Sequence, residues 1–283
     1  MKKFLCMTAA VVMALSVAGC SSNITTTTQD TSNNDAENAE TSTVTVFAAA
    51  SMTETLNQIA EMYKEVDPSV ELVFNFDSSG TLKTQIQEGA DCDIFISAAQ
   101  KQMNQLDATQ DTEANPDGLD FIDHETRFNL VSNSVVLIAP EGNPKGLASF
   151  EDVGTDKVKL IALGNSDVPV GQYSEEIFTN MGIWDQLNAD GKITFGSNVK
   201  EVLAQVEEGA VDCGVVYSTD AATSEKVDVV ATAPEGTHKP IVYPAAVLKN
   251  APNAEKANEF LAYLKTDVCA DVFESVGFSI PEE

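Results

Sequence analysis

The chain has 283 residues, of which 43% are hydrophobic, so it can form one large domain or two lobes with substantial cores. Its 44 acidic residues outnumber its 16 basic ones, and the formal net charge is −28. This balance disfavours nucleic acid and anionic membrane surfaces as partners. Solubility is the simplest explanation of so acidic a surface.

Residues 1–19 have the pattern of a signal peptide, because Lys2 and Lys3 precede a largely apolar segment that ends in small residues. The small residues directly before Cys20 resemble the lipobox of bacterial lipoproteins. This resemblance implies that Cys20 is lipidated and becomes the first residue of the mature chain. A secreted protein that is cut nearby and carries no lipid is the alternative. Residues 20–43 are almost entirely polar or alanine, so we expect a disordered tether.

The segment from Val44 to Ala60 predicts a strand, a tight turn and a helix, because a β-branched and aromatic run is followed by apolar residues at helical spacing. Ser51 lies at the junction. With Glu54 three residues later it forms an S-x-x-E capping box, which predicts Ser51 as the helix N-cap. The free N–H groups of such a terminus favour an anion. An ordinary cap is the default explanation of a single box, and recurrence of the arrangement at three later turns is what favours a binding role.

A second strand, from Val70 to Phe76, leads into a hydroxyl-rich turn from Asp77 to Thr81. Ser79 can present both its O–H and its N–H group to a ligand there, and a plain exposed turn is the alternative. A third strand follows from Ile94 to Ser97. The apolar run from Leu130 to Pro140 predicts a buried strand that crosses into a second lobe.

In the second lobe, a strand from Val158 to Leu163 leads through a polar turn to a helix whose first residue is Pro169. The amides of Val170, Gly171 and Gln172 are then free to face a ligand.

Two further turns in this lobe repeat the arrangement. Asn198 and Glu201 form a capping box, which places Val199 at a helix N-terminal amide. Tyr217 ends a short strand, at the edge where open α/β sheets bind their ligands. A buried tyrosine that bonds to other protein groups is the alternative for this residue.

Alternating strands and helices predict an α/β fold with two lobes, mainly parallel sheets flanked by helices, and a ligand cleft between the lobes. We expect residues 44–130 and 238–283 to form the first lobe and residues 131–237 the second.

Metal and cysteine chemistry find little support in the sequence. His124 and His238 lack ligand spacing, and no histidine is placed to activate a cysteine. Beyond Cys20 the chain has an odd number of cysteines, so at least one of Cys92, Cys213 and Cys269 is unpaired within the chain. The first two precede strands and are expected to be small buried hydrophobic residues.

The candidate binding groups are hydroxyls and backbone amides, and no Arg or Lys is among them. They belong to Ser51, Ser79, Val170, Val199 and Tyr217. Such a set of donors suits a fully ionised oxyanion, which has no proton to donate. Asp77 does not fit this chemistry, since its carboxylate would repel a bare dianion and would suit hydrogen phosphate. We therefore expect its side chain to point away from the site.

Five segments together resemble the molybdate-binding proteins of bacterial ABC transporters, in order and with compatible spacing from about Val44 to Ile280. They are Val46–Ser51, Phe76–Leu82, Asp93–Ala98, Val168–Gly171 and Gly214–Tyr217. The resemblance implies a type II periplasmic binding protein, extracytoplasmic and anchored by lipid, that closes on molybdate or tungstate and delivers it to a membrane permease.

The resemblance also implies which residues hold the oxyanion of the bound metal, molybdenum or tungsten. Serine hydroxyls match Ser51 and Ser79, backbone amides match Val170 and Val199, and a tyrosine hydroxyl matches Tyr217. No cofactor is implied beyond the ligand, and we expect a monomer. Asp77 and Gly80 replace small or hydroxyl residues of some members, and Cys92 and Cys213 are not expected family features.

Three other interpretations remain. The ligand could be another tetrahedral oxyanion, sulfate or phosphate. A surface adhesin or receptor could keep the fold without transport. A hydrolase with Ser51 or Ser79 as nucleophile is disfavoured, because the chain has neither a G-x-S-x-G motif nor a histidine base at suitable spacing.

Overall fold

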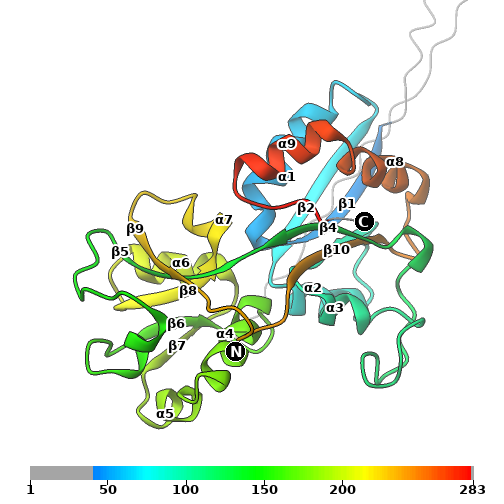
Figure 1. Ribbon diagram of the computed structural model, residues 1–283. Coiled ribbons are helices and arrows are strands. Elements are labelled where there is room, and N and C mark those ends of the chain that lie inside the picture. The colour runs from blue at the N-terminus through cyan, green and yellow to red at the C-terminus, as the bar shows by residue number, and fades with distance from the viewer. Residues whose placement is uncertain (1–40, 282–283) are drawn as a thin grey trace, which may run out of the picture. The chain divides into compact units, whose positions relative to one another are not determined.

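The computed structural model describes residues 41–281, so the predicted signal peptide, Cys20 and nearly all of the expected tether lie outside the described residues. Ser42 and Thr43, the expected end of the tether, belong instead to the first strand. Two five-stranded sheets, each with its own helices, make up this part of the chain (Figure 1). We call the first sheet with its helices the first lobe, and the second sheet with its helices the second lobe. Within residues 41–281 no helix is long and apolar enough to cross a membrane.

The first sheet has a parallel core to which antiparallel strands are added. Its strands in spatial order are β2 (Val70–Asp77), β1 (Ser42–Ala49), β3 (Ile94–Ile96), β10 (Ile241–Val247) and β4 (Phe128–Asn133). β1 is parallel to β2 and β3, whereas β10 is antiparallel to β3 and β4. The helical segments of this lobe are η1 (Ala50–Met52), α1 (Thr53–Tyr63), α2 (Ser79–Gln87), α3 (Gln100–Asn104), η2 (His124–Thr126), α8 (Ala254–Leu264) and α9 (Asp267–Ser275).

The second sheet repeats this plan. Its strands in spatial order are β7 (Ile193–Gly196), β6 (Ile161–Gly164), β8 (Cys213–Tyr217), β5 (Val135–Pro140) and β9 (Val227–Thr232). β6 is parallel to β7 and β8, and β5 is antiparallel to β8 and β9. The helical segments are η3 (Phe150–Gly154), α4 (Pro169–Asn180), α5 (Trp184–Ala189), α6 (Val199–Glu207) and α7 (Ser218–Ala221). The predicted two-lobed α/β architecture is confirmed, but the sheets are mixed and not mainly parallel as expected, because each has both parallel and antiparallel pairings.

Side chains of β1 alternate between two hydrophobic layers. Val44 and Val46 belong to the core under α1, α8 and α9, whereas Phe47 packs with Leu82 and Ile86 of α2 on the other face. The chain steps from β1 outward to β2 and then back across to β3. Because such connections are right-handed, α1 and α2 must cover opposite faces of the sheet. The sheet is therefore buried on both sides, and its strand ends are the places left for a ligand.

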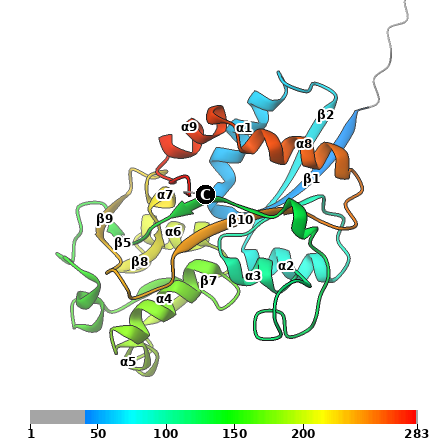
Figure 2. The same cartoon turned by 45° about the vertical axis from the view of Figure 1, so that its right-hand side comes forward.

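The chain passes between the lobes twice. β4 ends at Asn133 and β5 begins at Val135, so Ser134 alone separates strands of different sheets. The expectation of one continuous strand from Leu130 to Pro140 is therefore wrong. At the break, the Ser134 amide donates to Oδ1 of Asn133 and not to a neighbouring strand. The second passage, from β9 to β10, lies beside the first (Figure 2).

Candidate functional site

The carboxyl ends of the parallel strands of both lobes enclose one small cavity. Its lining includes Ser51 and Ser79 from the first lobe and Val199 and Tyr217 from the second, and Val170 directly follows the lining residue Pro169. Ligands of open α/β sheets bind outside the carboxyl ends of strands, at points where the strand order reverses. The structure thus brings the candidate residues, which are spread over 167 positions of the sequence, to one place.

Ser51 reaches the cavity in a different way from that predicted. It lies inside the 3₁₀ turn η1, and the N-cap of α1 is Met52, which makes no side-chain cap bond. The prediction of Ser51 as a capping residue is therefore wrong. Its hydroxyl lies 3.0 Å from the hydroxyl of Tyr243, and Glu54 pairs with Lys200 of the second lobe. Tertiary partners have replaced both halves of the expected capping box.

Ser79 is the first residue of α2, and the preceding Ser78 is its N-cap. The Ser78 hydroxyl accepts a bond from the amide of Thr81, so it satisfies the helix terminus. The Ser79 hydroxyl is fully buried and accepts a bond of 2.9 Å from the amide of Ala98, which follows β3. Since an amide is only a donor, the proton of Ser79 is left free for another acceptor.

Pro169 is the first residue of α4, as predicted. Of the three amides expected to be free, those of Gly171 and Gln172 both donate to the carbonyl of Val168, so the expectation is wrong for these two. Among the described residues, the Val170 amide has no acceptor. The helix start therefore offers a single amide where three were predicted.

Val199 is the first residue of α6, and Asn198 caps this helix as predicted, since its side chain accepts a bond from the Glu201 amide. The Glu201 carboxylate accepts from the amide of Ser197, one residue before the cap. Among the described residues, the Val199 amide has no acceptor. A capped terminus with one free amide favours an anion.

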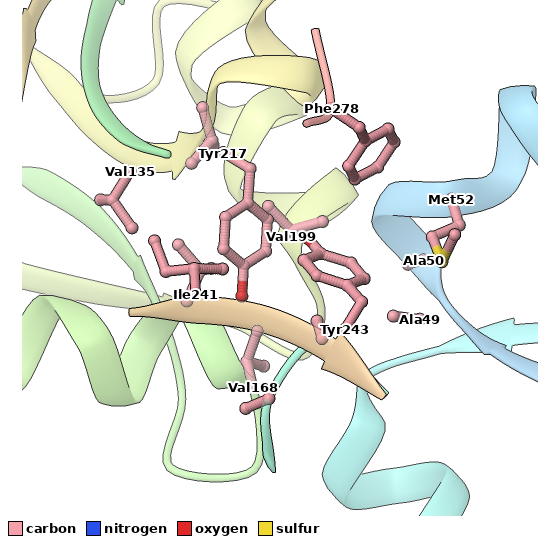
Figure 3. Close-up of a cluster of buried hydrophobic side chains, with 14 of the residues drawn as sticks. Ala49, Ala50, Met52, Val135, Val168, Val199, Tyr217, Ile241, Tyr243 and Phe278 are labelled. Carbon is pink, nitrogen blue, oxygen red and sulfur yellow. The ribbon is translucent and has the colours of Figure 1, made fainter. Parts of the chain in front are cut away.

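Tyr217 is fully buried at the end of β8, and within residues 41–281 its hydroxyl has no hydrogen-bond partner. Figure 3 shows its ring beside Tyr243 and Val199. Burial raises the pKa of Tyr217 well above its ordinary value, so the hydroxyl keeps its proton at physiological pH. A buried hydroxyl without a partner is costly, and this one lies in the cavity wall, where a ligand oxygen would satisfy it.

Asp77 also lies in the cavity wall, contrary to the expectation that it would point away. Its Oδ1 accepts a bond of 2.7 Å from the Ser78 amide, and Nδ2 of Asn198 from the second lobe lies 3.5 Å from the same oxygen. The carboxylate therefore has donors of its own on one side.

Two groups of residues around the cavity were missed by the sequence analysis. Tyr243 and Asn133 lie on β10 and β4, next to the two passages between the lobes. Tyr243 contacts Ser51 directly, and Asn133 contacts Tyr243. Lys200 of the second lobe lies 2.8 Å from Glu54 of the first and 3.2 Å from the buried Asp220. Nothing in the sequence pattern signals either group, because the partners are far apart along the chain.

No cluster of three or more His, Cys, Asp or Glu side chains that could hold a metal ion occurs in residues 41–281. Cys92, Cys213 and Cys269 are free and buried, as expected for the first two. Burial raises the pKa of Cys92 to about 12, so this thiol is unreactive at neutral pH. Apart from Asp77, the candidate residues at the cavity can donate hydrogen bonds from neutral groups.

Residues 44–279 match the model of the family of bacterial extracellular solute-binding proteins. The chain is 40% identical over 245 residues to the molybdate-binding protein ModA of Haemophilus influenzae. These residues make up 85% of this chain and 91% of that protein. This chain belongs to the ModA family of solute-binding proteins. It is also 37% identical over 279 residues to YvgL of Bacillus subtilis, covering 98% of both chains; that protein is named as an ABC transporter substrate-binding lipoprotein.

The fold of the family is also that of this chain. The periplasmic molybdate-binding protein of Azotobacter vinelandii superimposes with a TM-score of 0.72 at 24% identity, over 84% of this chain and 100% of that one. The resemblance noted in the sequence and the predicted type II periplasmic binding protein fold are confirmed. Members of the ModA family bind solutes and are not enzymes, which agrees with the expected absence of a catalytic site.

Proposed function

We propose that this protein captures molybdate, and also tungstate, between its two lobes and delivers it to the permease of an ABC transporter. Ser51, Ser79 and Tyr217 would donate from their hydroxyls, and Val170 and Val199 from their backbone amides. The two anions have the same charge and nearly the same size, so neutral donors would accept both.

One observation carries this proposal: the cavity collects donors whose protons are free, and no Lys or Arg of residues 41–281 lines it. The Ser79 oxygen already accepts from the amide of Ala98. Within the part of the chain that the structure describes, neither the Tyr217 hydroxyl nor the Val199 amide has a hydrogen-bond partner. Lys200 follows Val199, but its ammonium group is engaged by Glu54 and Asp220. A tetrahedral dianion without protons is the ligand that such a set satisfies best.

The location follows from the same proposal. A lipid on Cys20 would tether the domain outside the cytoplasmic membrane, next to its permease, with residues 21–41 as a linker. The word lipoprotein in the name of the relative from Bacillus subtilis, which matches nearly the whole chain, supports this anchor. Replacing Cys20 by Ser should release the protein from the membrane fraction, and retention of the variant there would contradict the anchor.

Calorimetric titration of residues 41–283 with molybdate, tungstate, sulfate and phosphate tests the ligand. Tight binding of one molybdate or tungstate per chain, with little heat from sulfate and phosphate, is the expected result. Absence of binding heat with all four anions would overturn the proposal and favour an adhesin or receptor that keeps the fold without transport.

Hydrogen phosphate is the second candidate, and the position of Asp77 favours it. A carboxylate in the cavity wall can accept the proton of hydrogen phosphate, which molybdate lacks at neutral pH. Two donors already lie beside Oδ1 of Asp77, from Ser78 and Asn198, which is why we rank this candidate second. Binding of phosphate alone, lost on replacing Asp77 by Asn, would reverse the order.

A further inference from the structure

The hydroxyls of Ser51 and Tyr243 lie 3.0 Å apart, and by distance alone either could be the donor. Tyr243 is fully buried on β10, at a point where the pairing register of β10 with β4 shifts between Tyr243 and Pro244. Irregularities of this kind redirect side chains and are frequent beside functional sites. Figure 3 shows the Tyr243 ring next to that of Tyr217, and the two ring centres are 5.7 Å apart.

The side chain of Asn133, at the passage between the lobes, decides the direction of this bond. Its Oδ1 accepts from the amide of Ser134 at 2.8 Å and from the hydroxyl of Ser218 at 3.0 Å. Since an amide N–H is only a donor, the oxygen of Asn133 must lie on that side. Its Nδ2 therefore faces the hydroxyls of Thr219, at 2.9 Å, and Tyr243, at 3.3 Å.

Tyr243 thus accepts a bond from Asn133 and must place its own proton elsewhere. A fully buried hydroxyl needs an acceptor for its proton, and Nδ2 of Asn133 cannot serve as one. Among the described residues, the acceptor within hydrogen-bond distance is Oγ of Ser51. Tyr243 is then the donor and Ser51 the acceptor, and the proton of Ser51 is left to point into the cavity.

We propose that Tyr243, oriented by Asn133, is a positioning residue that makes Ser51 a hydrogen-bond donor toward the ligand. This inference rests on the proposed function, because it assumes that Ser51 contacts an oxyanion. Ser79 supports it by independent geometry: there the amide of Ala98 occupies the serine oxygen and leaves the proton free. The Ala98 amide donates to Ser79 and the Tyr243 hydroxyl donates to Ser51, so the proton of each serine is free to face the ligand.

The residues that orient Ser51 lie beside the passage between the lobes. Asn133 ends β4, Tyr243 lies on β10, and Ser218 and Thr219 begin the helix that follows Tyr217. The direction of the hydrogen bonds that run from Asn133 through Tyr243 to Ser51 therefore depends on contacts that both lobes make. The direction of the Ser51 proton is set in the region about which the lobes would move.

A double-mutant cycle with molybdate as the probe tests the inference. We expect Tyr243→Phe to weaken molybdate binding by about three- to tenfold, because Ser51 loses the donor that orients and polarises it. In the Ser51→Ala background, the same change should have no further effect on affinity, since Tyr243 acts through Ser51. Tyr63→Phe is the matched control, because Tyr63 lies in the first lobe and packs against Phe260 away from the cavity. Urea unfolding of each variant separates loss of affinity from loss of stability.

The outcomes are distinct. Unchanged affinity of Tyr243→Phe, or a loss of the same size with and without the Ser51→Ala change, would overturn the role of Tyr243 while leaving molybdate binding intact. Binding of none of the four anions by the unaltered protein would overturn the proposed function and this inference together. Loss that appears only when Ser51 is present would establish the positioning role.

Discussion

The backbone amide of Gly80 in the first lobe donates a hydrogen bond of 3.0 Å to the carbonyl oxygen of Asp167 in the second lobe. A Cβ atom at position 80 would lie 2.3 Å from that oxygen, far inside van der Waals contact. The second residue of α2 is therefore a place where the lobes touch through backbone alone, beside the cavity. Glycine is required there because any side chain would hold the lobes apart.

Replacing Gly80 by Ala should leave both lobes folded and weaken molybdate binding by at least about tenfold, because the closed arrangement becomes less accessible. Small-angle scattering with saturating molybdate should show a wider molecule than the unaltered protein. Gly154→Ala is the control, since a Cβ there meets only the side chain of Ile183 at 3.4 Å. Equal affinity of the Gly80 variant would show that this contact does not limit closure.

Replacing Ser79 by Ala should weaken molybdate binding by about 1.5–3 kcal/mol, because it removes a hydrogen bond to a charged ligand. It should also destabilise the protein by about 1–3 kcal/mol, since the buried amide of Ala98 loses its acceptor. Titration calorimetry and urea unfolding measure the two effects separately. Ser275→Ala, whose hydroxyl bonds within α9, should change neither affinity nor the cavity. Full affinity of the Ser79 variant would remove Ser79 from the site.

Replacing Glu54 by Gln should weaken binding by about two- to fivefold at low salt, because the pair with Lys200 joins the lobes near the cavity. The effect should shrink as salt is raised, since Glu54 is half exposed and its charge is screened. Glu61→Gln is a matched control, because Glu61 lies on the same helix and pairs with Lys64 inside the first lobe. A loss of the same size for both variants would rule out a specific role in closure.

Stability should depend on Asp220 between about pH 4 and pH 6. Burial raises the pKa of this carboxyl to about 6, with Lys200 opposing the shift and Glu54 adding to it. In that range the folded protein holds a proton that the unfolded chain releases, so the free energy of unfolding falls as pH rises.

The free energy of unfolding of Asp220→Asn, taken relative to that of the unaltered protein, should rise by about 3 kcal/mol from pH 4 to pH 7. This is the change expected when the pKa of a carboxyl is raised by about two units. Urea unfolding at several pH values measures this difference, with Asp271→Asn on the exposed side of α9 as the control. A difference that does not vary with pH would contradict a raised pKa at Asp220.

The sequence predicted the helix starts around the site correctly where they depend only on neighbouring residues. Asn198 caps α6 and Pro169 opens α4, because both effects depend on residues within one turn of each other. The same reasoning failed for Ser51 and Glu54. Their partners, Tyr243 and Lys200, are 192 and 146 residues away, and no local pattern reports such contacts.

By itself, the sequence determined the α/β class, the positions of the strand-to-helix turns and the neutral chemistry of the candidate donors. These depend on periodicity and on which residue types stand at each turn. The tertiary structure alone decided which of those donors are free. Gly171 and Gln172 donate within their own turn. The Ser79 oxygen accepts from the amide of Ala98, 19 residues away, and the Ser51 hydroxyl lies 3.0 Å from the hydroxyl of Tyr243 on β10. A donor is engaged or available according to what lies within about 3 Å of it, and that distance is set by packing between distant segments.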